Sequence, residues 1–163
     1  TVNVIDLAAR QFNPVMSTSE WNTYRQGNGE IPAGLEFDVE SVKAADVIVF
    51  VYPTWWGGLP AQLKGWLERV MLPGTAFVFN DKNKVRPGLG NIKRIHIAST
   101  FGSPWLYVRI VNDNGRRILA RAFRLNTSVR TKVSTSSLYA MDTATDKSRK
   151  SFLLALEQKM ESM

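Results

Sequence analysis

The clearest hydrophobic pattern lies in the middle of the chain, where an unbroken apolar run precedes an amphipathic one. Residues 47–52 (VIVFVY) are apolar or aromatic without alternation, which predicts a strand covered on both faces near the centre of a parallel sheet. Pro60 suits the first turn of a helix. After it, apolar residues recur at intervals of three and four, as on a helix with one buried face: Leu63, Trp66, Leu67, Val70 and Met71.

The same patterning predicts further elements along the chain. Strands are expected over residues 2–7, 75–79, 91–100 and 131–141, the last polar enough for the edge of a sheet. Helices are expected over residues 18–26, 37–46, 114–125 and 143–163, the first with Ser17 or Thr18 as its N-cap. Strands that alternate with helices are typical of an α/β fold with a parallel sheet. We therefore expect one α/β domain over residues 1–163.

Two of the expected helices have an apolar face and a polar face. In the helix over residues 114–125, Ile118, Leu119, Ala122 and Phe123 are expected to face inward, and Arg116, Arg117, Arg121 and Arg124 outward. In the C-terminal helix, the expected apolar stripe is Phe152, Leu153, Leu156 and Met160. Both helices are therefore predicted to pack one face against the sheet.

Basic charge gathers in one part of the chain, which carries a net charge of +7 overall. From Lys82 to Lys132 there are twelve Lys and Arg residues and a single acidic one, Asp113. Such a field attracts anions such as nucleotide phosphates, nucleic acid or acidic lipid, and a solvated basic face with no specific partner is an equal alternative. Nucleic acid is not expected, because the basic residues are interleaved with core-patterned segments.

Several classes of site are not expected from the composition. The chain has no cysteine, which excludes disulfides and fits a reducing cytoplasm. Its one histidine, His96, lies among isoleucines and is expected in the core or on a sheet face, so no metal site is expected. No apolar run approaches the ~20 residues that span a bilayer, so no membrane span is expected. Acidic residues show no paired spacing, and hydrolase chemistry is not expected.

Two loops follow predicted strands at their carboxyl ends, where open parallel sheets bind ligands. The first, residues 53–59 (PTWWGGL), offers Trp55 and Trp56 beside the backbone N–H groups of Gly57 and Gly58. The second, residues 99–104 (STFGSP), offers hydroxyl groups around a glycine. Flat aromatic walls with backbone donors suit a planar ring with polar edges, such as a flavin. The alternative is that the tryptophans only pack in the core.

The first of these loops belongs to a longer motif. Residues 47–77 (VIVFVYPTWWGGLPAQLKGWLERVMLPGTAF) resemble the flavodoxin-like NAD(P)H:quinone oxidoreductases, whose third strand ends in a proline and aromatic loop before P-A-x-L-K-G-W-x-(D/E)-R-V. Further similarity appears in residues 5–17 (IDLAARQFNPVMS), 99–102 (STFG), 112–124 (NDNGRRILARAFR) and 138–145 (LYAMDTAT). The resemblance therefore extends over nearly the whole chain.

The resemblance implies a doubly wound parallel sheet of order 2-1-3-4-5, bound FAD or FMN, and a homodimer. It also implies two-electron, ping-pong hydride transfer from NAD(P)H through flavin N5 to a quinone. Carried over by motif, Pro53, Thr54, Trp55, Trp56 and Gly57 line one side of the flavin ring, and Ser99, Thr100, Phe101 and Gly102 hold its pyrimidine edge. Tyr107 lies where relatives place a tyrosine that balances charge on the reduced flavin, and it is the candidate catalytic residue.

The chain departs from the family pattern at three points. The histidine that partners this tyrosine in some relatives has no counterpart, although Asp113 lies near its place, and Gly57 replaces a usual aromatic. The family also begins with a strand, a phosphate loop and a helix, which do not precede Thr1, so residues 2–7 are expected to be the second strand. A missing central strand leaves buried backbone groups unpaired at ~1–3 kcal/mol each. We therefore expect the full-length gene product to carry this segment, and the 163-residue chain alone to bind flavin weakly and to be marginally stable.

Three functions remain open at this point. The resemblance favours a flavin-dependent NAD(P)H:quinone oxidoreductase that acts on a quinone or a related small acceptor. One alternative is a regulatory flavoprotein subunit of a potassium-efflux system, which would dock to a membrane transport protein through the Arg116–Arg124 face. The other is a truncated, non-catalytic member of the family.

Overall fold

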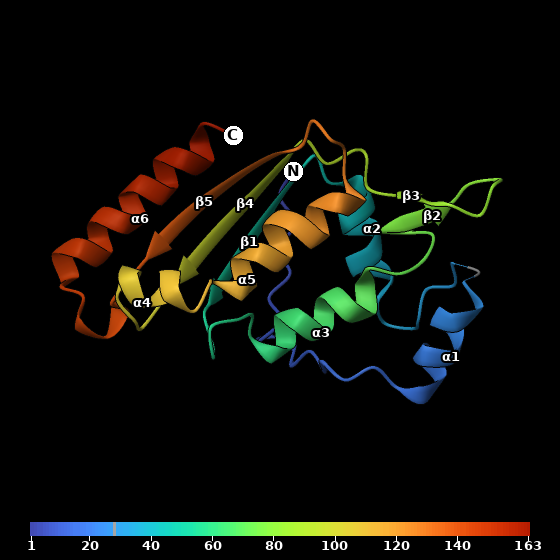
Figure 1. The fold of residues 1–163 in the computed structure, drawn as a ribbon, viewed down its shortest axis with the longest axis horizontal. Helices are drawn as coiled ribbons and strands as arrows, with labels where there is room; N and C mark the ends of the chain where they lie inside the picture. Colours follow the sequence, from blue (N-terminus) through green and yellow to red (C-terminus); the bar gives the residue numbers. More distant parts are fainter. Residues whose placement is uncertain (28) are drawn as a thin grey trace.

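Three parallel strands form the sheet at the middle of the fold (Figure 1). The structure is a computed structural model and describes residues 1–27 and 29–163. The strands β1 (Val47–Pro53), β4 (Arg94–Thr100) and β5 (Lys132–Leu138) lie in the order β1-β4-β5. Their register pairs Pro53 with Thr100 and Thr100 with Leu138, so the three carboxyl ends lie side by side. The strands expected near these positions are confirmed, and β5 lies at the edge of the sheet as predicted.

Helices connect the strands and pack against the sheet (Figure 1). They are α1 (Thr18–Gln26), α2 (Glu36–Ala44), α3 (Ala61–Val70), α4 (Trp105–Ile110), α5 (Asn114–Arg117) and α6 (Asp146–Glu161). A small antiparallel hairpin joins β2 (Phe77–Phe79) to β3 (Val85–Pro87). Ser17 caps α1 in a reciprocal capping box with Glu20, which confirms one of the two expected caps.

One face of the sheet carries the aromatic core. The ring of Phe50 packs edge-on against Trp66 of α3, with ring centroids 6.4 Å apart, and against Phe123, at 5.2 Å. The expected apolar face of α3 is confirmed: Leu63, Trp66, Leu67 and Val70 are buried. The spacing of three and four residues therefore identified the side of α3 that packs on the sheet.

The other face of the sheet lies under α6 only in part. Arg94 Nη1 donates a hydrogen bond to the backbone oxygen of Met163 beyond the end of α6, at 2.9 Å. On β1 the same face is open, and Val47, Val49 and Val51 are 36%, 40% and 73% exposed. The prediction that residues 47–52 are covered on both faces is therefore wrong. Within the described residues β1 pairs only with β4. Helix α6 lies beside β5, at the edge of the sheet opposite to β1 (Figure 1).

The apolar stripe expected on α6 is only partly covered. Phe152, Leu156 and Met160 are half-buried, whereas Leu153 is 61% exposed. The prediction is therefore wrong for Leu153. The reason is that no other element packs against Leu153 on this face of the sheet, in the part of the chain that the structure describes.

Residues 2–7 do not form the expected strand. Residues 2–6 have no regular secondary structure, Leu7 lies in a turn, and Val2 and Val4 are exposed. A strand requires a neighbouring strand for its ladder of hydrogen bonds, and no described strand pairs with this segment. The strand expected here from the apolar residues and from the resemblance is therefore wrong.

The helix predicted over residues 114–125 is confirmed, but its helical type changes along the segment. The α-helical turn α5 continues into a π-helical segment, η1 (Ile118–Phe123), and a 3₁₀ turn, η2 (Arg124–Asn126). Leu119 and Phe123 are buried as expected, whereas Ala122 is exposed and that prediction is wrong. The wider π-helical turn rotates later residues away from the positions that an ideal 3.6-residue period assigns.

None of the helices formed by the described residues is long and apolar enough to cross a membrane. His96 is completely buried on β4, which confirms its expected place in the sheet. Its Nδ1 lies 2.8 Å from the hydroxyl of Ser134 on β5. The histidine is therefore held inside the sheet rather than at its carboxyl edge.

Candidate functional site

The two loops predicted to form a site meet at the carboxyl edge of the sheet. Residues 53–59 follow β1, and residues 99–104 follow β4. The backbone N–H of Thr54 donates to the backbone oxygen of Thr100 at 2.8 Å. The register of neighbouring parallel strands therefore fixes the two loops against each other.

The first loop is a tight turn that exposes its tryptophans. Trp55 and Gly58 exchange backbone hydrogen bonds of 3.2 and 2.8 Å across it. The expectation that the Gly58 N–H is offered to a ligand is therefore wrong, because this group donates to Trp55 inside the turn. At its tip, Trp56 (φ 49°) and Gly57 (φ 68°) both lie in the left-handed region, as a type I′ turn requires. Trp55 is 63% exposed and Trp56 is fully exposed, so the alternative that both only fill the core is wrong. A non-glycine residue at positive φ stores strain, which is common at functional turns.

The second loop presents backbone rather than large side chains. Ser99 is buried, with its hydroxyl 3.3 Å from that of Ser137, and Phe101 is buried and stacked on Tyr139 with ring centroids 5.0 Å apart. Gly102 lies so close to Asp142 that an added Cβ would sit 2.7 Å from its carboxylate oxygen Oδ2. Among the residues predicted to hold a ring edge, Ser99 and Phe101 are therefore buried, whereas Thr100 and Gly102 are at least partly exposed.

One polar atom at the meeting point of the loops is buried without a partner. Thr54 Oγ1 makes no hydrogen bond to any described residue. A buried hydroxyl left in this state costs free energy, and a ligand edge or water normally satisfies it. With the exposed indole rings on the same turn, this hydroxyl fits the polar edge of a bound planar ring such as a flavin.

Two tyrosines near the site differ in their surroundings. Tyr107, the candidate catalytic residue, lies on α4 with 57% of its surface exposed. Tyr52 is buried at the end of β1, and its hydroxyl has no hydrogen-bond partner among the described residues. Burial raises the pKa of Tyr52, and the negative charge of Asp113 raises it further. Tyr52 is therefore a neutral hydroxyl beneath the turn, and Tyr107 is the accessible one.

The tryptophan turn also rests on the start of α5. The backbone N–H of Asn114 donates to the oxygen of Gly57 at 3.2 Å. An added Cβ on Gly115 would lie 3.0 Å from the carbonyl carbon of Gly58. Neither Asn114 nor Gly115 is a predicted site residue, although a glycine inside a predicted helix is a signal of close packing. The turn is therefore supported by two separate segments, β4 with its loop and α5.

Comparison with known proteins agrees with this geometry. The profile of a family described by the flavodoxin-like fold matches residues 1–124. The chain belongs to the flavodoxin-like fold family. The expected family and fold class are confirmed, and the order β1-β4-β5 agrees with the 3-4-5 portion of the expected sheet order.

Curated relatives with similar sequences carry oxidoreductase names. An uncharacterized NAD(P)H oxidoreductase of Haemophilus influenzae is 38% identical over 104 residues, which cover 63% of this chain and 50% of the relative. The NAD(P)H dehydrogenase (quinone) 1 of Rattus norvegicus is 28% identical over 117 residues, 63% of this chain and 42% of the relative. An FMN-dependent NADH:quinone oxidoreductase of Bradyrhizobium sp. is 38% identical over 73 residues, 45% of this chain and 35% of the relative. The chain spans half or less of these relatives.

Solved structures show the same flavodoxin-like fold. Smu.1420 from Streptococcus mutans is similar with a TM-score of 0.83 and 25% identity, over 100% of this chain and 84% of that one. An NAD(P)H:quinone oxidoreductase from Methanothermobacter marburgensis is similar with a TM-score of 0.78 and 22% identity, over 94% of this chain and 77% of that one. These similarities support the arrangement of sheet and helices described above.

Proposed function

We propose that this chain carries the ring-binding side of a flavin-dependent NAD(P)H:quinone oxidoreductase. The observation that carries the proposal is the exposed Trp55–Trp56 turn, held by backbone hydrogen bonds at the carboxyl edge of a parallel sheet. Ligands of open α/β sheets bind at that edge. The oxidoreductase names of the relatives support the reaction class. A bound flavin supplies the two-electron chemistry that joins NAD(P)H oxidation to quinone reduction, in the ping-pong order that the resemblance implies.

Each site residue then has a specific role in binding. The exposed indoles of Trp55 and Trp56 stack against the ring or the quinone and keep water from that face. The unpartnered Thr54 hydroxyl donates to a polar ring edge. On the second loop, Thr100 and Gly102 contact the other edge through backbone groups. Tyr107, exposed on α4, offers its phenolic hydroxyl to the ring and helps to balance charge there.

The identity of the flavin is part of this proposal. FAD is the expected cofactor and FMN its alternative, and the FMN-dependent relative supports testing FMN first. The homodimer and the cytoplasmic location stay predictions, as does the choice of quinone as acceptor.

The transporter-docking alternative has less support from the structure. Arg116 is already paired with Asp113, its Nε lying 2.7 Å from the carboxylate. Arg124 donates from Nε to the backbone oxygen of Thr131 at 3.2 Å. Part of the arginine face that would dock to a membrane protein is therefore used inside the chain.

Flavin-dependent turnover tests the proposal directly. The full-length gene product is incubated with saturating FMN or FAD, and oxidation of NADH and NADPH is followed with menadione as the acceptor. The Trp56→Ala variant is expected to bind flavin or acceptor between about twofold and tenfold more weakly, since an aromatic stack contributes ~0.5–1.5 kcal/mol. Its unfolding free energy is expected to stay unchanged, because the Trp56 side chain is fully exposed.

A matched control is Trp21→Ala. Trp21 is also exposed and aromatic, but it stacks on Tyr24 within α1, away from the sheet edge (Figure 1). The flavin affinity and the turnover of this variant are expected to equal those of the unmodified protein. The proposal is wrong if neither flavin supports turnover, or if both variants lose affinity equally.

A further inference from the structure

Two exposed segments lie side by side at the end of the sheet where its strands begin. The hairpin β2–β3 precedes β4, and residues 124–131 precede β5. The backbone N–H of Leu89, just after β3, donates to the oxygen of Asn126 in η2 at 2.9 Å, and Leu89 and Thr127 form a parallel bridge. We call residues 78–86 and 124–132 together the amino-edge surface. The tryptophan turn lies at the opposite, carboxyl edge of the sheet.

The amino-edge surface exposes large apolar side chains. Four of them are between 50% and 91% exposed: Phe79, Val85, Leu125 and Val129. Phe79 and Val85 are direct cross-strand partners in the hairpin, so their side chains lie on the same face of it. Exposed apolar side chains that gather in one place, with polar residues around them, mark an interaction surface.

The turn that carries Val129 is held firmly on both sides. Thr127 and Thr131 are buried, and the Thr131 hydroxyl donates to the backbone oxygen of Ile92 at 2.7 Å. Arg124 donates from Nε to the backbone oxygen of Thr131 and from Nη2 to that of Val129, each at 3.2 Å. Val129 therefore projects into solvent from an anchored turn, and the fold itself fixes its exposure.

The hairpin projects in a similar way. It extends away from the body of the molecule (Figure 1). The Asn80 side chain closes its loop, because Oδ1 accepts from the backbone N–H of Lys82 at 3.1 Å and from that of Lys84 at 2.9 Å. Both parts of the amino-edge surface are therefore projecting tips rather than the walls of a groove.

Positive charge surrounds these apolar side chains. Residues 78–86 and 124–132 contain six Lys and Arg residues and one acid, Asp81. All six cations are exposed, and none forms an ion pair with a carboxylate of the described residues: Lys82, Lys84, Arg86, Arg124, Arg130 and Lys132. A partner that fits this surface therefore offers negative charge together with an apolar phase.

We propose that the amino-edge surface docks the protein on an anionic membrane surface. The apolar tips enter the boundary between headgroups and acyl chains, and the cations attract acidic lipid headgroups. The chain lies on the membrane surface, and the tryptophan turn at the other edge of the sheet stays in water. The proposal goes beyond the oxidoreductase activity and does not depend on it, since the amino-edge surface shares no residue with the proposed flavin site.

Other occupants fit these observations less well. Contact with the same surface of a second copy would bring two groups of six cations together, and their like charges repel. Nucleic acid would meet the cations, but the aliphatic side chains of Val85, Leu125 and Val129 neither stack on bases nor bind phosphates. An acidic protein would need a surface shaped to fit both tips, whereas fluid lipid adapts to them.

Sedimentation with lipid vesicles tests this proposal without any redox reaction. The full-length gene product is mixed with vesicles of phosphatidylcholine alone, or of equal parts phosphatidylcholine and phosphatidylglycerol. We expect at least about tenfold tighter binding to the anionic vesicles, since each Lys or Arg near such a surface contributes about fivefold, or ~1 kcal/mol. Raising the ionic strength from about 0.01 M to about 0.15 M shortens the screening length from ~30 Å to ~8 Å and is expected to weaken this binding.

Matched variants locate the contact on the molecule. Arg130→Gln is expected to weaken binding to the anionic vesicles by about fivefold, and Val129→Asp by at least about tenfold. Lys150→Gln and Leu154→Asp make equivalent changes at exposed positions of α6, away from the hairpin (Figure 1). These two control variants are expected to leave binding unchanged.

The proposal is overturned if the protein does not sediment with anionic vesicles at low ionic strength, if both kinds of vesicle bind equally, or if the control variants lose as much affinity. Tighter binding to a DNA duplex than to anionic vesicles also overturns it and identifies nucleic acid as the partner. Dissociation of a dimer by Val129→Asp in analytical ultracentrifugation overturns it as well, because it identifies a contact between two copies. These outcomes do not involve flavin, so they are separate from a failure of the proposed oxidoreductase function.

Discussion

At the scale of single residues, the buried carboxylate of Asp38 joins three segments of the chain. It accepts hydrogen bonds from Arg10 Nη1 at 3.0 Å, Arg10 Nη2 at 2.8 Å and Trp66 Nε1 at 2.7 Å. Asp38 is completely buried on α2, whereas Arg10 belongs to the N-terminal segment and Trp66 to α3. Arg10 and Trp66 both need this carboxylate as an acceptor, because a buried donor without an acceptor costs free energy.

Replacing Asp38 is therefore expected to destabilise the whole fold. Asp38→Ala leaves the buried indole N–H and a partly exposed guanidinium without their acceptor, and we expect the unfolding free energy to fall by ~2–4 kcal/mol. Urea unfolding followed by circular dichroism measures the change. Asp46→Ala is the control, because the Asp46–Lys93 pair is exposed on both sides and is expected to contribute less than ~1 kcal/mol. Similar losses in the two variants would contradict this account of Asp38.

At the scale of elements, the tryptophan turn depends on how closely α5 approaches it. Gly115 in α5 leaves no room for a methyl group, since an added Cβ would lie 3.0 Å from Gly58 and 3.1 Å from the backbone nitrogen of Leu59. The N–H of Asn114 holds the oxygen of Gly57 in the same contact. A small displacement of α5 therefore moves the turn that carries Trp55 and Trp56.

Gly115→Ala is expected to displace this turn. Overpacking of this kind shifts the backbone and typically costs ~1–3 kcal/mol. We expect a lower flavin affinity and turnover, together with a shift in tryptophan fluorescence. Gly90→Ala is the matched control, because nothing lies within 4 Å of its added Cβ. An unchanged flavin affinity in Gly115→Ala would show that α5 does not set the position of the turn.

The elements also show which features the sequence could predict. The apolar periodicity of α3 and the unbroken run of β1 are local signals, and both elements lie where they were expected. The prediction of a strand over residues 2–7 is wrong, because a strand forms only beside a partner strand, whatever its own residues are. Exposure of Val51 likewise depends on what packs beside β1.

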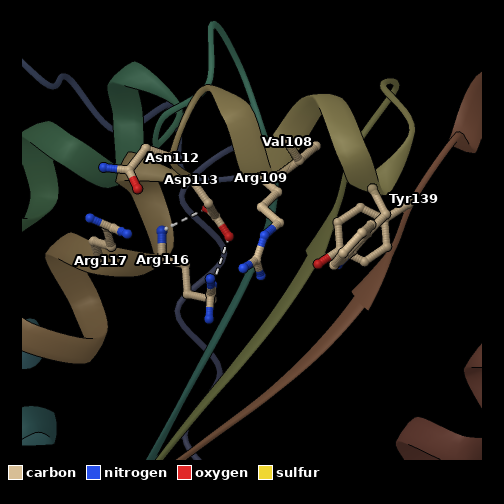
Figure 2. Close-up of a pocket in the computed structure, with 8 residues that line it drawn as sticks. Val108, Arg109, Asn112, Asp113, Arg116, Arg117 and Tyr139 are labelled. Carbon is tan, nitrogen blue, oxygen red and sulfur yellow. Dashed lines mark hydrogen bonds and ion pairs between the residues drawn. The ribbon is translucent and has the colours of Figure 1, made fainter.

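In the candidate site, too, some features could be predicted from local sequence and others depend on the fold. The motif around Trp55 and Trp56 marked the exposed turn correctly, whereas burial of Phe101 follows from its stacking on Tyr139, 38 residues later in the chain. The hollow between α4, α5 and Tyr139 was also hidden in the sequence (Figure 2). Trp105, Arg109 and Asp113 recur at four-residue spacing, but only the fold brings Tyr139 opposite them.

At the scale of the whole molecule, the sheet and α6 enclose the single histidine of the chain. His96 lies on the central strand β4, completely buried, with Ser134 of β5 beside it and Lys159 of α6 nearby. Burial lowers the pKa of His96 below its ordinary 6.5, and the positive charge of Lys159 lowers it further. The native state therefore holds a neutral imidazole, whereas the unfolded state takes up a proton near pH 6.5.

Global stability is consequently expected to fall as the pH drops below about 6.5. In that range the unfolded chain binds the proton and the folded chain does not, so each further pH unit costs up to about 1.4 kcal/mol until the folded histidine itself titrates. Urea unfolding at several pH values between about 7.5 and 5 measures the slope. Glu20, whose pKa is lowered from 4.5, acts only in more acidic solution. His96→Gln keeps a polar side chain but cannot titrate, and it is expected to remove this slope. A flat profile for the unmodified chain, or the same slope in both proteins, would show that the buried imidazole does not control the acid sensitivity of the fold.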